Sequence, residues 1–136
     1  MHGVQGADKL IELFGRWPSF HDAEVVSLVL DRAGDDDGFG PSLVATIRTF
    51  DITHEVLPDG LLKLTHECAA VMAFREVVQL QLTGFNSQNV LSGLHIIDIR
   101  DRQLERQRFE VWFAGVHGLD ARFQCRVVEV LSVTAL

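Results

Sequence analysis

Residues 62–75 of this chain read LKLTHECAAVMAFR, and this stretch carries the clearest structural pattern in the sequence. Every second residue from Leu62 to Phe74 is apolar except His66, while Lys63 and Thr65 begin the series on the opposite face. A period of two residues is typical of a β-strand that has one face on a core and one face in water. The pattern therefore predicts a strand over residues 62–75.

The sequence on either side of this stretch predicts more strands of the same kind. Pro58, Asp59 and Gly60 form a strong turn sequence, which should join residues 43–56 to the strand at 62–75 as a hairpin. Further strands are predicted at residues 25–30, 78–82, 94–100, 108–114 and 119–133. Loops are predicted at 34–38 (GDDDG) and at 84–93, where one helical turn is the alternative. One-sided alternation with short connections favours an antiparallel sheet.

A short helix is predicted ahead of the strands. Apolar residues between Ala7 and Phe14 approximate helical spacing, and Gly15 and Pro18 end the pattern. The predicted fold class is α+β, with a curved antiparallel sheet of about six to seven strands and a short N-terminal helix. At 136 residues the chain is expected to form a single domain over residues 1–136.

Composition narrows the classes of function. The chain is 47% hydrophobic with a net charge of −7, which indicates a globular protein and disfavours nucleic acid as a partner. No leader peptide is visible at the N-terminus, and no apolar run is long enough to span a membrane. Cys68 and Cys125 lack metal-ligand spacing and are predicted to be reduced core thiols. We expect a cytoplasmic protein without a cofactor or metal.

Residues 17–25, WPSFHDAEV, concentrate groups that could carry chemistry. If the chain is extended from Phe20, Asp22 and Glu24 share the core face and His21 points to the other side. A metal site made by His21, Asp22 and Glu24 would then need a bulge or a turn, and we predict no metal site. A paired-carboxylate hydrolase remains an alternative. Ser19 and Asp22 also match a capping box that would begin a helix at Phe20, although the valines that follow favour a strand.

Two segments combine aromatic rings with polar side chains, as protein interfaces often do. The candidate interface or signature residues are Trp17, Phe20, His21, Asp22, Glu24, Phe85, Asn86, Gln88 and Asn89. The alternative for Trp17 is structural, with the ring anchoring the helix to the sheet.

The WPSFHDAEV stretch resembles the opening signature of the immunity protein 50 family, small cytoplasmic proteins associated with bacterial polymorphic toxin systems. Residues 82–91, LTGFNSQNVL, extend this resemblance. The resemblance implies a non-catalytic protein that binds and neutralises a cognate protein toxin, and it carries over no catalytic residue. Two alternatives stay open. One is a small hydrolase or ligand-binding domain that uses His21, Asp22 and Glu24, and the other is a homodimerising structural protein.

Overall fold

The antiparallel sheet and the N-terminal helix are both present. The computed structural model describes residues 1–35 and 39–136, and within these ranges it contains eight strands, one α-helix and one 3₁₀ helix. These elements are α1 (Asp8–Phe14), β1 (Glu24–Asp31), β2 (Ser42–Val56), β3 (Leu62–Arg75), β4 (Val78–Thr83), β5 (Val90–Asp98), η1 (Arg100–Arg102), β6 (Phe109–His117), β7 (Asp120–Cys125) and β8 (Val127–Ala135). The predicted GDDDG loop falls partly on positions 36–38, which lie outside the described residues.

The prediction of six to seven strands was too low, because residues 119–133 form two strands instead of one. The chain breaks at Arg126, whose backbone N–H donates to the carbonyl of Arg75 at 3.0 Å. Through this bond Arg126 pairs with the end of β3 and no longer with β6, a partner of β7. The chain then continues as β8, which pairs with β3. The predicted loop at 84–93 is also shorter than expected, because β5 begins at Val90.

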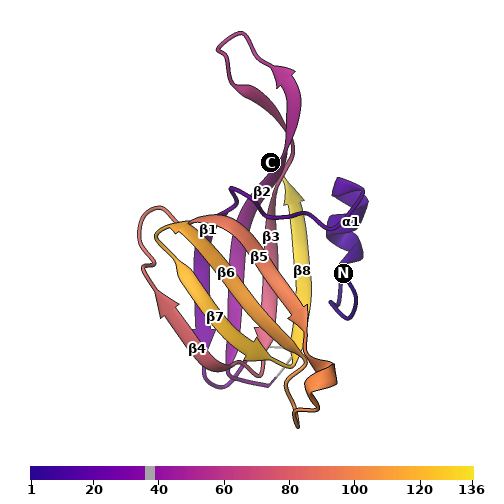
Figure 1. Ribbon diagram of the computed structural model, residues 1–136, viewed down its shortest axis with the longest axis vertical. Helices are drawn as coiled ribbons and strands as arrows, with labels where there is room; N and C mark the ends of the chain where they lie inside the picture. The colour runs from indigo at the N-terminus through magenta and orange to yellow at the C-terminus, as the bar shows by residue number, and fades with distance from the viewer. Residues whose placement is uncertain (36–38) are drawn as a thin grey trace.

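All eight described strands form one sheet in the order β4-β7-β6-β5-β1-β2-β3-β8, and every neighbouring pair is antiparallel. The sheet folds over on itself, so that β4 to β7 lie in front of β1, β2, β3 and β8 (Figure 1). Phe74 of β3 meets the other layer, with its ring 5.6 Å from Phe113 and 5.3 Å from Phe123. The core therefore fills the space between the two layers.

The two layers are joined at two places. In the middle of the strand order, β1 meets β5 through a single register pair, Glu24 with Val90. At the crossing from β7 to β8, the N–H of Arg126 donates to the carbonyl of Arg75, whose side chain is only 4% exposed and forms ion pairs with Asp35 at 2.8 Å and with Glu129 at 2.6 Å. We call the first junction the seam, and define it as residues 20–25 and 86–91.

Helix α1 follows the prediction closely and lies beside β8, the edge strand of the sheet (Figure 1). Leu10 and Phe14 are its buried residues. Gly15 ends the helix in the left-handed conformation at φ 78°, where its N–H donates to the carbonyl of Ile11.

The predicted hairpin forms, but its outer half does not join the body of the protein. On β3 the apolar face is buried from Cys68 to Phe74, whereas Leu62 and Leu64 are exposed. Strands β2 and β3 run beyond the other strands and project from the sheet as a two-stranded ribbon (Figure 1). We call residues 51–66 the β2–β3 arm.

Both cysteines lie in the core, as predicted, and neither is in a disulfide. Burial raises the pKa of the Cys125 thiol to about 12 and also raises that of Cys68. Among the described residues, no helix is long and apolar enough to cross a membrane.

Candidate functional site

The WPSFHDAEV segment is a turn that leads into β1, so the strand predicted at 25–30 is confirmed, whereas the chain is not extended from Phe20. Phe20 and Asp22 both adopt positive φ, at 60° and 64°, and β1 begins only at Glu24. The N–H of Ala23 donates to the carbonyl of Phe20 at 3.1 Å, which closes the turn. The alternative of a helix beginning at Phe20 was also wrong.

This turn changes which side chains share a face. Ala23 and Val25 are fully buried, while Asp22 is exposed and Glu24 is half-buried, so the predicted core face was wrong for these residues. A second irregularity, between Val25 and Ser27, shifts the register against β2. The left-handed residues and the bulge each break the period-two alternation on which the prediction depended.

His21 does not point away from both acids, as strand alternation had predicted. Its Nε2 lies 3.6 Å from Asp22 Oδ2, and both side chains are largely exposed. Its Nδ1 lies 3.1 Å from the carbonyl of Ser92. Glu24 makes a different contact: its Oε2 accepts a hydrogen bond from the backbone N–H of Asn89 at 2.8 Å. The three side chains therefore do not converge on one point.

Asn89 is the centre of the seam. It is only 3% exposed, and its amide makes four hydrogen bonds. Oδ1 accepts the N–H of Asn86 at 3.0 Å and that of Leu119 at 3.1 Å. Nδ2 donates to the carbonyl of Asn86 at 2.9 Å and to that of Val25 at 3.2 Å. One side chain thus joins β1, the β4–β5 loop and the β6–β7 turn.

Backbone hydrogen bonds complete the junction. The N–H of Val25 donates to Asn89, that of Leu91 donates to Ala23, and that of Asp22 donates to Leu91, each at 2.9 Å. The two segments that resemble a family signature, 17–25 and 82–91, therefore meet in space and hold the layers together. Their spacing in the sequence gave no sign of this contact, since 64 residues separate Val25 from Asn89.

Exposure divides the nine candidate residues into two groups. Phe20 and Asn89 are buried, and Trp17 is half-buried with its ring 5.8 Å from that of Phe20. His21, Asp22, Asn86 and Gln88 are exposed, as is Phe85 at 45%. Only this second group, with half-buried Glu24 at its margin, is available to a partner.

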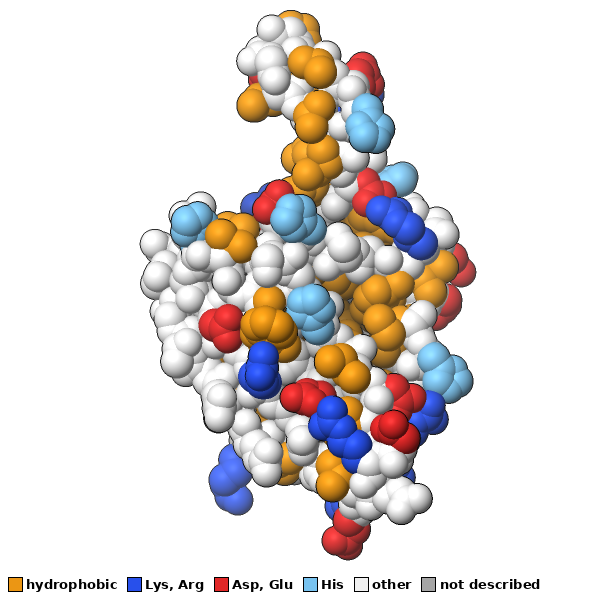
Figure 2. Space-filling view, in the orientation of Figure 1, with side chains coloured by type: hydrophobic (Ala, Val, Ile, Leu, Met, Phe, Trp, Pro, Cys, Tyr) orange, Lys and Arg blue, Asp and Glu red, His pale blue; other side chains and the backbone are white. Residues whose placement is uncertain are grey.

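The β2–β3 arm carries a surface that the sequence analysis did not single out. Its apolar face has two cross-strand pairs, Ile52 with Leu64 and Val56 with Leu62. These four side chains are between 38% and 63% exposed, and Leu57 and Leu61, which follow at the tip, are exposed as well. Apolar side chains run along the visible side of the arm in Figure 2. A contiguous exposed apolar face is characteristic of interaction sites.

The opposite face of the arm is polar. Thr53 Oγ1 donates to the carbonyl of Lys63 at 2.8 Å, and Lys63 Nζ lies 3.6 Å from Glu55 Oε2. The arm is thus an amphipathic ribbon with both faces in solvent. Two-stranded hairpins are only marginally stable alone in water, so a ribbon of this kind gains from a partner that covers its apolar side.

Asp51 fixes the root of the arm. Its carboxylate accepts a hydrogen bond from Arg16 Nη2 at 2.8 Å and lies 3.2 Å from His66 Nδ1. The ring of His66 also packs edge-on against Phe14 of α1, with 5.5 Å between centroids. The hydrogen bond from Arg16, together with that from His66, lowers the pKa of Asp51. The arm therefore leaves the body at an anchored position, close to the segment that leads into the seam.

Metal binding finds no support in this arrangement. Within residues 1–35 and 39–136, no group of three or more His, Cys, Asp and Glu side chains is placed to hold a metal ion. The exposed His21 and Asp22 make a pair, and Glu24 is occupied by Asn89.

Comparison with known proteins gives one match. Residues 6–136, nearly the whole chain, match the family described as Immunity protein 50. Neither curated proteins nor solved structures provide a match to this chain. The family match includes both segments of the seam and the whole of the β2–β3 arm. The chain therefore belongs to the Immunity protein 50 family.

Proposed function

We propose that this protein binds a protein toxin and blocks it by covering its surface, without catalysing a reaction. The family match over residues 6–136 carries this proposal, because immunity proteins are named for protection against a toxin. The arrangement of the candidate residues supports it. The polar groups that first suggested chemistry are either exposed as a single His–Asp pair or used in hydrogen bonds that hold the fold.

We propose that the toxin contacts the end of the molecule that carries the β2–β3 arm. The arm, the turn before β1 and the loop between β4 and β5 lie toward this end (Figure 1). His21, Asp22, Phe85 and Gln88 supply exposed side chains there, and the arm supplies an apolar face. Aromatic and apolar groups surrounded by polar ones are the usual composition of a binding site for protein.

The shape of the arm limits what the partner can look like. A narrow ribbon that projects from the body can reach into a concave surface and place its apolar face against one wall of it. Its exposed leucines, with Ile52 and Val56, require an apolar wall in that cleft. The polar face, with Glu55 and Lys63, would lie toward solvent or toward the rim. The proposed partner is therefore a toxin with a cleft, and the proposed place of binding is the cytoplasm.

Titration of toxin activity tests the proposed function. The toxin encoded beside this gene is purified, and its activity is measured while the immunity protein is added in steps. A protein that blocks by covering should abolish activity at a one-to-one molar ratio, and the complex should have the summed mass of its two parts. Inhibition far below this ratio would indicate turnover and contradict the proposal. Full toxin activity in the presence of excess protein would also contradict it.

A further inference from the structure

The outer edge of β8 already accepts an added strand from its own chain. The N–H of Gln5 donates to the carbonyl of Val128 at 2.9 Å, and the N–H of Val130 donates to the carbonyl of Gln5 at 2.8 Å. Gln5 thus forms an isolated parallel bridge with Glu129. This is strand addition on a minimal scale, and it covers only the first part of the edge.

Beyond Val130 the same edge has no backbone partner among the described residues. The inner edge is fully used, since Val133 pairs with Ala70, Thr134 with Ala69 and Ala135 with Cys68. The N–H of Leu136 donates inward, to the carbonyl of Glu67 at 2.9 Å. Because backbone groups alternate in direction along a strand, those of Thr134 also face β3, and those of Val133 and Ala135 face outward.

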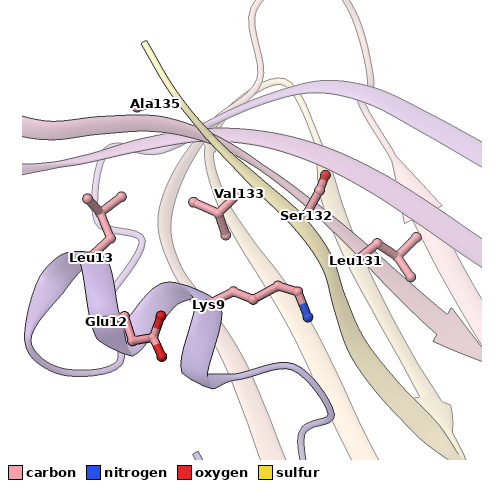
Figure 3. Close-up of a pocket in the computed structure, with 7 residues that line it drawn as sticks. All are labelled: Lys9, Glu12, Leu13, Leu131, Ser132, Val133 and Ala135. Carbon is pink, nitrogen blue, oxygen red and sulfur yellow. The ribbon is translucent and has the colours of Figure 1, made fainter.

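A groove of about 620 Å³ lies along this unpaired edge, between α1 and β8. Figure 3 shows Leu13 and Lys9 on the helix side and Val133 and Leu131 on the strand side. The apolar lining is Leu13 on the helix side and Leu131, Val133 and Ala135 on the strand side. Lys9 and Glu12 bring one charge of each sign, so the groove selects no net charge.

We propose that this groove takes an extended segment of a partner protein, which adds to β8 as a ninth strand beside Val133 and Ala135. Outward N–H and C=O groups with no partner are matched by the backbone of an extended chain, and side chains in the groove can supply selectivity. The bound segment would lie along the same edge of β8 as Gln5, farther toward the end of the strand. This site is separate from the β2–β3 arm and does not depend on toxin binding.

A second copy of the protein fits the groove less well than a single segment. Helix α1 stands beside β8, so the β8 edge of another copy would bring its own helix against this one (Figure 3). A lone strand needs only about 4.8 Å of space beside β8.

Amide hydrogen exchange and peptide selection together test the proposal. The probe is a phage-displayed library of random peptides of about six residues, the length of an ordinary strand. Selected peptides should slow exchange of the Val133 and Ala135 amides about tenfold or more, from rapid exchange in the free protein. Thr134 and Leu136 are internal controls, because their amides should be protected with and without peptide.

The matched variants are Val133→Pro and Ser132→Ala. Proline is tolerated at an edge position whose N–H faces solvent, so Val133→Pro should keep the fold and weaken peptide binding about tenfold. Ser132→Ala changes a side chain of the same groove, leaves the backbone donor in place and should bind normally. Failure to select any peptide, or equal binding to Val133→Pro, would overturn the proposal. Protection of Val133 and Ala135 in a dimer without peptide would also overturn it. If Val133→Pro does not fold, exchange in the wild-type protein decides the question.

Discussion

Asn89 shows how one buried side chain can hold two layers together. Its four side-chain hydrogen bonds use the whole capacity of the amide. No apolar residue of similar size could satisfy the N–H of Leu119 and the carbonyl of Val25 at the same time. The polar character of this position follows from the backbone groups that surround it.

Replacing this side chain should therefore be costly. Asn89→Ala leaves at least one buried donor and one buried acceptor unpaired, and we expect it to lower the free energy of unfolding by about 2–4 kcal/mol. Urea denaturation measures the effect. Gln88→Ala, at the exposed neighbouring residue, is the control and should change stability by no more than about 0.5 kcal/mol. Equal effects from the two variants would show that Asn89 does not hold the seam.

Asp51 makes a pH-dependent contribution to stability. Its pKa is lowered in the folded protein, first by the hydrogen bond from Arg16 and also by that from His66. A carboxyl with a lowered folded pKa stabilises the fold above its unfolded pKa of about 3.9, and this contribution is lost as the pH falls through the folded value. The difference in stability between wild type and Asp51→Asn should thus be largest near neutral pH and shrink below about pH 4.

The measurement is urea denaturation of both proteins across this acid range. Arg16→Gln supplies the control, because it removes the group that contributes most to the lowered pKa of Asp51. On that background Asp51→Asn should show a much weaker dependence on pH. An undiminished pH dependence without Arg16 would contradict this account.

At the scale of elements, the apolar face of the β2–β3 arm should contribute little to the stability of the fold and much to the proposed binding of the toxin. Its apolar face is exposed, so polar substitutions there remove little buried area from the folded protein. We expect Val56→Ser combined with Leu62→Ser to leave the melting temperature nearly unchanged. The same pair should weaken toxin affinity about tenfold or more, because it removes the centre of the proposed contact.

The control lies on the opposite face of the same ribbon. Glu55→Gln combined with Lys63→Gln removes the polar cross-strand pair, should preserve toxin affinity and should also leave the melting temperature unchanged. Calorimetric titration of both double variants against the toxin gives the comparison. Equal losses of affinity on the two faces, or no loss on either, would contradict the role given to the apolar face.

Elements with a regular period were predictable from sequence, and junctions between elements were not. Alternation from Leu62 to Phe74 located β3, and Gly15 located the end of α1. The alternation could not show that Leu62 and Leu64 lie beyond the ends of the other strands. An alternating apolar pattern is the same in sequence whether the apolar face packs on a core or faces solvent. The turn at Phe20 and Asp22 could not be predicted, because positive φ is uncommon at residues other than glycine and most of all at a bulky residue such as Phe20.

The candidate site was predictable to a similar degree. The sequence indicates the segments at 17–25 and 85–89 as candidate interface or signature residues, but it does not show that Phe20 and Asn89 are buried. Their contact with each other depends on the folding of the sheet, and no local pattern encodes it. The arm was visible only as a hairpin with a Pro58–Gly60 turn, and its exposure follows from how far the neighbouring strands extend.

For the molecule as a whole, the shared core should make the two layers unfold together. Phe74 packs against Phe113 and Phe123 across the layers, the seam joins β1 to β5, and the N–H of Arg126 donates to the carbonyl of Arg75 where the chain crosses from β7 to β8. The chain has two tryptophans: Trp17 packs on Phe20 of the seam, and Trp112 lies on β6. In Trp17→Phe the remaining fluorescence follows the layer that contains β6, and in Trp112→Phe it follows the seam. We expect the two urea transitions to coincide.

Adding Phe74→Ala should lower stability by about 3–5 kcal/mol in both backgrounds, because it opens a cavity that both layers line. Separate midpoints, or a loss seen by one tryptophan alone, would show that the layers are independent units joined by a weak seam.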